Sequence, residues 1–226
     1  MDDRVTRRGS LVRLGGFVAA LLGAGGFEAG ASGGPAGVAS GAVGCVLTPE
    51  QTEGPYYIAG EKMRRNITEG RPGTPLTLRL AVVDASTCRP IKSAAVDIWH
   101  ADAGGAYSGF GGGSGSRTFM RGIQRTDARG IAIFRTVYPG WYPGRTVHVH
   151  VKVHVGGRVV HTGQLYFPDS LTNAAYRKAP YSKRPGRDTR NATDAVFRNG
   201  GKRSVLRLRR NGAGYLGTIT MGVHRS

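Results

Sequence analysis

Hydrophobic and polar residues alternate with a period of two along residues 147–155, the clearest pattern in this sequence. Valines occupy the odd positions, and the even positions carry His148, His150, Lys152 and His154. In an extended strand successive side chains point to opposite faces, so the valines lie on one face and the polar residues on the other. The segment therefore predicts a strand with one core face and a second face that either carries chemistry or meets water.

Other short segments show similar patterns. Strands are predicted over residues 76–82, 94–99, 130–137, 158–167, 205–209 and 215–223, and one short helix is predicted over residues 170–178. Gly156-Gly157 and Asn211-Gly212 have the composition of two-residue hairpin turns. Short strands separated by turn signals predict an all-β fold, an antiparallel β-sandwich with long loops and little helix. The 226 residues suffice for one such domain with a sizeable core.

The first residues have a different composition. Arg7-Arg8 is followed by a short, mildly apolar run and then by a glycine- and alanine-rich stretch. We expect residues 1–44 to be a twin-arginine-type export signal and leader, followed by a domain at residues 45–226. The run is too short and glycine-rich for a membrane span. The expected location is periplasmic or extracellular, and the alternative is a disordered basic leader with no targeting role.

The chain has two cysteines, Cys45 and Cys88. In an exported protein a disulfide between them is the simplest expectation. Lipidation of Cys45 is the competing interpretation, although the usual leucine three positions earlier is missing.

The chain is strongly basic, with a formal net charge of +18 and a dense group of Lys and Arg between residues 177 and 210. Such a surface can attract nucleic acid, an anionic polymer or an acidic substrate. Aromatic residues are not interleaved as stacking platforms, and no known nucleic-acid module is recognisable. We therefore expect no specific nucleic-acid partner and interpret the basic region as a solvated surface.

Candidate chemistry is concentrated around the valine–histidine strand. His148 and His150 would present two imidazoles about 7 Å apart along the strand, a spacing that suits two ligands of one metal ion. The pair alone is a weak signal and is more typical of an amphipathic strand with a solvated His/Lys face. Tyr142 lies six residues before His148, in a turn fixed by two Pro-Gly pairs. A phenolate beside imidazole suits ferric iron better than softer divalent ions.

Four ordered motifs carry a family resemblance, at residues 48–57, 96–108, 138–150 and 162–168. With them the chain resembles the intradiol ring-cleavage dioxygenases, the non-haem iron(III) family that includes catechol 1,2- and protocatechuate 3,4-dioxygenases. The resemblance implies that Fe(III) is bound by Tyr107, Tyr142, His148 and His150.

The resemblance also implies roles for residues around the metal. Arg145 and Gln164 would line the substrate side as catalytic residues, and Tyr142 would leave the metal when a catechol binds and act as a base. Thr52, Gly54 and Pro55 are similar to the segment that lines the substrate pocket in the family. The glycine-rich loop at residues 104–115 surrounds Tyr107 and either shapes substrate entry or is a plain long loop.

The implied activity is cleavage of a catechol-type ring between its two hydroxyl-bearing carbons by O2, giving a cis,cis-muconate-type diacid. Two alternatives stay open on the residues alone. One is an exported basic β-sandwich that binds an anionic polymer without catalysis, and the other is a divalent-metal hydrolase built on the histidine pair. The identity of the catechol and the oligomeric state, a homo-oligomer included, are left open by the sequence.

Overall fold

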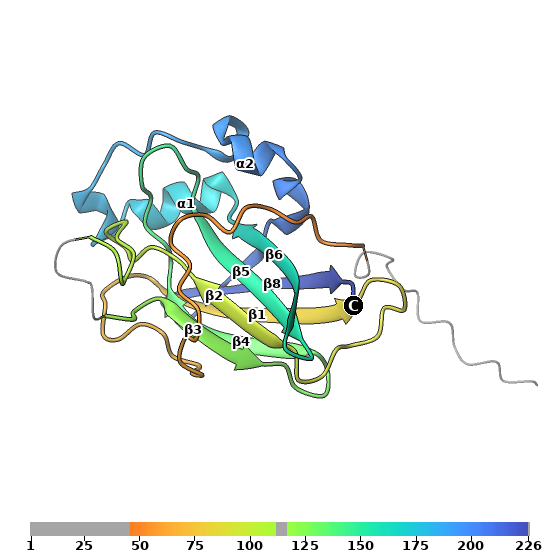
Figure 1. Ribbon diagram of the computed structural model, residues 1–226. Coiled ribbons are helices and arrows are strands. Elements are labelled where there is room, and N and C mark those ends of the chain that lie inside the picture. Colours follow the sequence, from red (N-terminus) through yellow and green to blue (C-terminus); the bar gives the residue numbers. More distant parts are fainter. Residues whose placement is uncertain (1–45, 112–116, 226) are drawn as a thin grey trace, which may run out of the picture. The chain divides into compact units, whose positions relative to one another are not determined.

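A computed structural model describes residues 46–111 and 117–225 of the protein. Eight strands form two sheets of four, in the orders β4-β1-β8-β7 and β3-β2-β5-β6 (Figure 1). The strands are β1 (Pro75–Asp84), β2 (Ala95–Trp99), β3 (Arg121–Arg125), β4 (Ile131–Val137), β5 (His148–Val155), β6 (Arg158–Tyr166), β7 (Arg207–Asn211) and β8 (Gly214–Val223). The all-β sandwich predicted from the sequence is confirmed.

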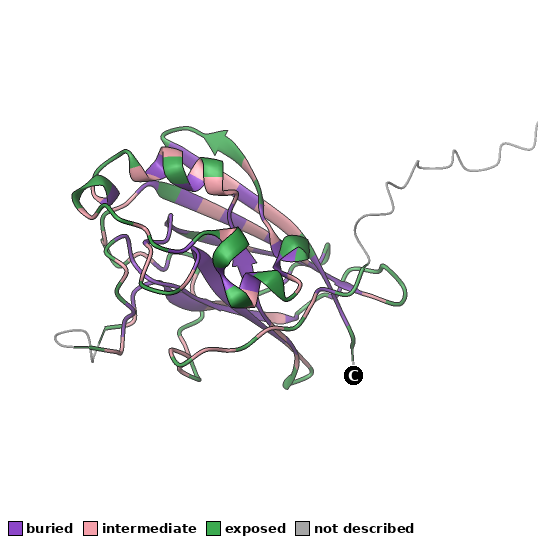
Figure 2. Ribbon diagram, turned by 90° about the horizontal axis from the view of Figure 1, so that it is seen from above, coloured by how far each residue is buried: buried purple, intermediate pink, exposed green. Residues whose placement is uncertain are grey.

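The core lies between the two sheets and is built by the alternating residues of the facing strands. In β1 the inward side chains Leu76, Leu78 and Leu80 are almost fully buried, and in β5 the valines are buried in the same way. Burying such an aliphatic side chain contributes about 1.5–3 kcal/mol. Figure 2 shows this burial along the core strands, with exposed residues in the connections and on the helices, and β7 is a mostly exposed strand.

The pairing differs from a purely antiparallel sandwich at one position. Strands β1 and β8 run parallel, with Leu76 opposite Tyr215 and Asp84 opposite Val223. These strands come from opposite ends of the domain, so their connection runs through the rest of the fold and is not a hairpin, the connection that would impose antiparallel pairing. The other strand pairs are antiparallel.

Strand β3 was not predicted from the sequence. Its residues, RGIQR, contain only one aliphatic side chain and no alternation. Pairing with β2, which places Ile98 opposite Gly122, holds this segment extended. Tertiary pairing therefore overrides a weak local signal.

Helical segments gather at one end of the sandwich (Figure 1). They are α1 (Asp169–Tyr176), α2 (Ala195–Arg198) and the short 3-10 turns η1 (Tyr181–Lys183), η2 (Asn191–Thr193) and η3 (Gly201–Ser204). The helix expected at residues 170–178 is confirmed as α1, and the others had no clear sequence signal. Asp194 caps α2 by accepting a hydrogen bond from the Phe197 N–H at 2.8 Å.

Several expectations concern residues outside the described ranges. The leader at residues 1–44, Cys45 and part of the glycine-rich loop, residues 112–116, are among them. Cys88 is disulfide-bonded, as the sequence predicts, and its expected partner Cys45 lies beyond the described part of the chain. In the described residues, no helix has the length and apolarity needed to cross a membrane.

Candidate metal centre

Strand β5 carries the histidine pair on the outer face of its sheet. His148 and His150 alternate with core valines and are themselves buried, at 2% and 0% exposure. His150 lies opposite Trp99 of β2 on one side and opposite Gln164 of β6 on the other. The polar face of this strand is therefore enclosed within the protein at the position of the pair.

The orientation of the His148 ring is fixed by a carbonyl group. Its Nδ1 lies 2.6 Å from the backbone oxygen of Thr146, which can only accept, so Nδ1 carries the proton and Nε2 keeps a lone pair. That Nε2 atom lies 3.0 Å from Nε2 of His150. A carbonyl that orients a ligating histidine in this way is a common arrangement at protein metal sites.

The ring of His150 is positioned by packing. It stacks on Trp99 with centroids 4.9 Å apart and planes 5° from parallel. On its other side the chain approaches at Gly54, where an added Cβ would lie 3.0 Å from His150 Cε1 and where φ is +74°. Only glycine fits this close approach without strain. The Nδ1 atom of His150 is buried and has no hydrogen-bond partner among the described residues.

Tyr142 and Tyr107 complete the cluster. The Tyr142 hydroxyl lies 3.1 Å from His148 Nε2, to which it donates in the tautomer set by Thr146. The Tyr107 side chain interacts in turn with Tyr142. The Tyr107 ring stacks on Tyr56, with centroids 4.3 Å apart, and meets the Tyr142 ring edge-on at 5.6 Å. The structure thus brings together all four predicted ligands.

Burial keeps these four groups neutral when no cation is bound. It raises the pKa of Tyr107 well above its usual value, with the neighbouring Tyr142 adding to the effect, and it also raises the pKa of Tyr142. Burial, followed by the charge of Arg145, lowers the pKa of His148 to about 3, and burial lowers the pKa of His150 well below its usual value. Neutral imidazoles are ready to ligate, whereas the phenols must lose protons first.

The cluster fits a single metal ion. Two ligands bound at right angles with bonds of about 2.1 Å lie about 3 Å apart, which matches the spacings from His148 Nε2 to His150 and to Tyr142. In this buried space two imidazole Nε2 atoms 3.0 Å apart can both turn their lone pairs to one cation. The two phenolates are hard anionic donors, whereas the imidazoles suit iron and zinc alike, so the phenolates make iron(III) the better match for the set.

Arg145 lies beside this cluster and is held from two sides. Its Nε donates to Asp194 Oδ2 at 2.9 Å, and its Nη2 donates to the side-chain oxygen of Gln164. Gln164 in turn donates from Nε2 to the Thr52 carbonyl at 3.0 Å. The predicted pair Arg145 and Gln164 is therefore brought together at the centre, on a fixed hydrogen-bonded chain.

The predicted substrate-lining segment also lies at the centre. Gly54 contacts His150, the Thr52 carbonyl accepts from Gln164, and Pro55 follows in the same turn. Aromatic side chains pack around the two imidazoles. They are Trp99, Tyr56, Tyr57 and Phe110, together with the ligands Tyr107 and Tyr142. These side chains form an apolar wall on which a flat aromatic ring can pack.

Asp194 is a residue at this centre that the sequence did not predict. Its buried carboxylate accepts from the Thr146 N–H at 2.7 Å, from the Phe197 N–H and from Arg145. Burial opposes the ionised form, but these hydrogen bonds and the charge of Arg145 outweigh it and hold the pKa of Asp194 below its usual value. Because Asp194 lies 49 positions from Arg145, no local pattern marks it.

Trp99 and Tyr56 were also assigned no role from the sequence. Trp99 does follow the strand alternation: it lies two residues after Asp97, on the same outward face of β2 as that buried polar residue. This parity is a signal that could have placed Trp99 beside the histidines. Tyr56 lies in a turn and shows no such pattern.

The simplest interpretation of this strand from the sequence was a solvated His/Lys face. The remaining polar residues of β5 show that this interpretation is wrong. Lys152 is 6% exposed, forms an ion pair with Glu53 and lies 3.6 Å from the centroid of the Tyr57 ring. His154 lies beyond a break in register after Val153 and is half-buried. The N-terminal segment of the domain, residues 51–64, covers this face, so the polar row is internal.

The fold and this cluster point to the class of β-sandwich dioxygenases, and comparison with known proteins agrees. The family profile described as "Dioxygenase" matches residues 52–182, more than half of the chain. A solved structure of an intradiol ring-cleavage dioxygenase from Tetranychus urticae is 36% identical, with a TM-score of 0.77, over 80% of this chain and 96% of that one. The chain therefore belongs to the intradiol ring-cleavage dioxygenase family.

Two further relatives show the extent of the likeness. The dioxygenase domain of a dioxygenase carbohydrate-binding protein fusion from Streptomyces sp. SirexAA-E is 36% identical, with a TM-score of 0.62, over 80% of this chain and 99% of that one. Catechol 1,2-dioxygenase 2 of Acinetobacter lwoffii is 36% identical over 99 residues, 42% of this chain. The matched part of the chain spans 35% of the length of that curated relative, or about a third.

Proposed function

We propose that this protein is a non-haem Fe(III) intradiol dioxygenase that cleaves a catechol-type ring with O2 and releases a cis,cis-muconate-type diacid. The observation that carries the proposal is the convergence of two phenols and two imidazoles on one buried point. His148 Nε2 lies 3.0 Å from His150 Nε2 and 3.1 Å from the Tyr142 hydroxyl. Arg145 and Gln164 lie beside this point, where a bound substrate would present its oxygens.

The four ligand side chains would hold the ion, and their unequal burial gives them unequal roles. When bound, iron(III) would supply the Lewis acidity that makes a chelated catecholate reactive toward O2. Tyr107 is 5% exposed and stacked on Tyr56, so it is the fixed ligand. Tyr142 is more exposed and lies on a Pro-Gly turn. It is therefore the ligand that can move aside and accept a proton from a substrate hydroxyl at its Oη atom.

Arg145 would stabilise negative charge on the substrate oxygens and ring. Its guanidinium is held by Asp194 and Gln164, so it needs little reorganisation when that charge develops. A fixed donor in a site that excludes water typically contributes about 3 kcal/mol to such a step. The aromatic wall around Tyr56 and Tyr57 would exclude water from the same space.

The names of the relatives support a catechol as the substrate class. The curated relatives are catechol and chlorocatechol 1,2-dioxygenases. A planar ring with two neighbouring hydroxyls fits a site that offers an aromatic wall, a metal centre and a guanidinium side by side. The partners of the protein in this proposal are the catechol and O2.

We also propose that the protein is exported and acts in the periplasm or outside the cell. The support is the twin-arginine pattern at Arg7-Arg8, the apolar run after it and the disulfide at Cys88, a bond that persists in oxidising compartments. Fusion of residues 1–44 to a reporter, with Arg7-Arg8 changed to Lys-Lys as control, measures export. Equal export by both fusions would contradict a twin-arginine route.

Oxygen uptake by the iron-loaded protein over a panel of catechols tests the activity. We expect uptake of one O2 per ring-opened diacid and a visible tyrosinate-to-iron(III) absorption that shifts when a catechol binds. A zinc-dependent hydrolase or a binding module without catalysis would be colourless and would consume no O2. The Tyr107→Phe variant is the control, since a colour unchanged by this substitution would remove Tyr107 from the ligand set.

A further inference from the structure

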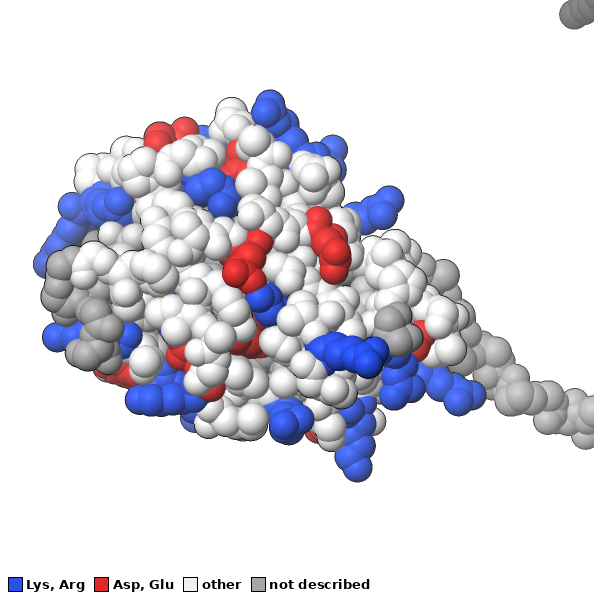
Figure 3. All heavy atoms as spheres, in the orientation of Figure 1, with Lys and Arg blue, Asp and Glu red and all other residues white. Residues whose placement is uncertain are grey.

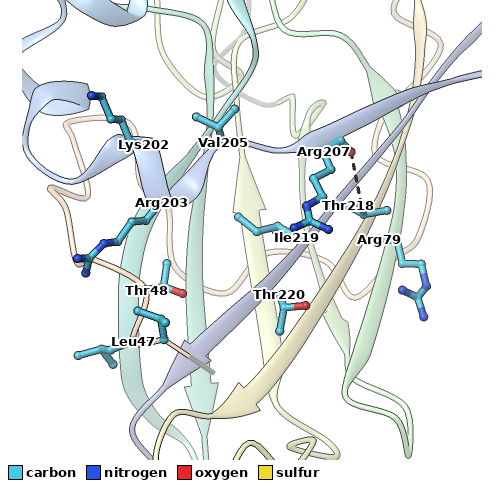
Figure 4. Close-up of a pocket in the computed structure, with 11 residues that line it drawn as sticks. Leu47, Thr48, Arg79, Lys202, Arg203, Val205, Arg207, Thr218, Ile219 and Thr220 are labelled. Carbon is cyan, nitrogen blue, oxygen red and sulfur yellow. Dashed lines mark hydrogen bonds between the residues drawn. The ribbon is translucent and has the colours of Figure 1, made fainter. Parts of the chain in front are cut away.

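A cavity of about 720 Å³ lies far from the metal centre, at the edge of the other sheet. Its walls come from η3, from β1, β7 and β8, and from the first described residues of the domain (Figure 4). The lining residues are Val46, Leu47, Thr48, Arg79, Lys202, Arg203, Val205, Arg207, Thr218, Ile219 and Thr220. This cavity is called the basic groove below. Four of its residues are cations, and among the described residues that line it none is acidic.

The cations of the basic groove are not neutralised within the fold. Other cations of this protein, including Arg64, Arg121 and Lys152, form ion pairs with acidic side chains. None of the four groove cations pairs with an acidic side chain of the described chain. Lys202, Arg203 and Arg207 are exposed and Arg79 is half-buried. The groove therefore presents uncompensated positive charge to solvent.

The strand register arranges this charge in rows. Arg79 of β1 and Arg207 of β7 both lie opposite Thr218 of β8, so the three residues form one row across the sheet. Adjacent strands are about 4.8 Å apart, which places the two arginine Cα atoms about 10 Å from each other. In the next row on the same face, Arg209 and Arg135 flank Leu216 and Thr77. The positive surface thus extends from the groove along the outer face of the sheet.

We propose that the basic groove and this adjoining row of arginines bind an extended acidic polysaccharide. Its repeated carboxylate or sulfate groups match guanidinium groups spaced along the sheet, and an arginine can bind either group through paired hydrogen bonds. The exposed hydroxyl of Thr220 offers a partner for a sugar hydroxyl. Nucleic acid is the less suitable ligand, because none of the described lining residues is aromatic and able to stack on a base.

The position of the groove keeps such a ligand away from the metal centre. The arginine rows lie on the outer face of β4-β1-β8-β7, whereas the metal cluster lies on the outer face of β3-β2-β5-β6, and the hydrophobic core separates the two. A polymer bound at the groove would hold the protein in place and leave the catechol site open. The groove is therefore an anchoring site, independent of the activity proposed above.

Binding of the full chain to soluble polymers, measured at several salt concentrations, tests this inference. The probes are polygalacturonate for carboxylates, dextran sulfate for sulfates, uncharged dextran and a single-stranded DNA. The test variant is Arg79→Ala/Arg207→Ala. The matched control is Arg158→Ala/Arg177→Ala, which removes the same charge from exposed positions outside the groove.

We expect salt-sensitive binding to at least one of the two acidic polysaccharides, and the preferred polymer identifies the anionic group. The test variant should bind at least about tenfold more weakly, and the control within about twofold of the wild type. Equal weakening in both variants would show attraction by net charge alone and overturn the proposal. No binding above uncharged dextran, or tighter binding of DNA that the test variant loses, would overturn it as well. Oxygen uptake with a catechol, measured on the same samples, reports separately on the proposed activity.

Discussion

The two outer faces of the sandwich have the same strand pattern and opposite environments. On β5, the polar residues between core valines are buried, with His150 at 0% and Lys152 at 6% exposure. On the other sheet, the equivalent outward positions stay open, and Arg135, Arg207 and Arg209 are exposed. In the view of Figure 3, basic side chains lie mainly around the edges of the molecule, and the few acidic ones are scattered. Alternation alone therefore does not tell a buried polar face from an exposed one.

The difference arises from the segments that cover one face and leave the other open. Residues 51–64 lie over β3-β2-β5-β6, where Arg121 donates to the Tyr56 carbonyl at 2.6 Å and Lys152 pairs with Glu53. Once covered, each polar group needs an internal partner or a metal ion, because an unpaired buried polar group is costly. The covered face thus acquires fixed geometry and internal partners, whereas the arginines of the open face stay exposed to solvent and available to a ligand. Coverage therefore turns a polar strand face into a buried site with fixed internal partners.

The largest expected effect comes from removing a ligand of the covered face. His148→Ala or His150→Ala should abolish iron retention, because each leaves fewer donors around the ion. Metal analysis of the purified variants measures this. His154→Ala, on the same strand but beyond the break in register, is the matched control and should keep its iron. Wild-type iron content in either of the first two variants would refute the ligand assignment.

The next largest effect is expected for the Arg145→Ala variant. We expect turnover to fall by about 10²-fold while iron content and visible colour stay as in the wild type, since Arg145 contacts the substrate side and not the ion. Steady-state oxygen uptake and metal analysis measure the two properties on one sample. Arg158→Ala, an exposed arginine of β6, should retain full turnover. Unchanged turnover in Arg145→Ala would remove this residue from the mechanism.

Asp194→Asn should have a smaller effect that reaches the centre through Arg145. Loss of the charge frees the Arg145 guanidinium, and we expect turnover to fall roughly tenfold with iron retained. Asp188→Asn, at an exposed carboxylate that accepts from Gly144 N–H, is the control.

The pKa of Asp194 also predicts how the stability of the fold depends on pH. Because the pKa of Asp194 is lower in the folded protein than in the unfolded chain, its ionised form stabilises the fold above the unfolded pKa. That stability is lost as the pH falls through the folded pKa. Thermal unfolding of the metal-free protein should thus show less acid sensitivity in Asp194→Asn than in the wild type. Identical pH profiles would mean that Asp194 is not linked to stability in this way.

The smallest effects are expected on the open face. Arg135→Ala and Arg209→Ala should each change the free energy of unfolding by no more than about 0.5 kcal/mol, because these solvated side chains form no ion pair with a described residue. Chemical denaturation measures the change. A destabilisation as large as that of a buried-site variant would show that the two faces are not as different as their exposure indicates.

Much of the fold was predictable because its signals are local. The alternation in residues 147–155 and 76–82 predicted β5 and β1, and the Gly156-Gly157 turn predicted the hairpin to β6. Strand β3 was missed because its stability comes from pairing with β2. The parallel pairing of β1 with β8 also has no local signal, since the two strands lie far apart in the sequence.

At the candidate site the sequence by itself determined which chemistry is available: two histidines of equal parity on one strand, a tyrosine on a rigid turn, and an arginine three residues before the first histidine. Only the tertiary structure decided that these groups converge. It placed Tyr107 and Tyr142 against the histidines, fixed Arg145 through Asp194, and covered one sheet while leaving the basic groove of the other open. The physical reason is that strand parity depends on neighbouring residues, whereas burial and convergence depend on contacts between segments that the folded core alone brings together.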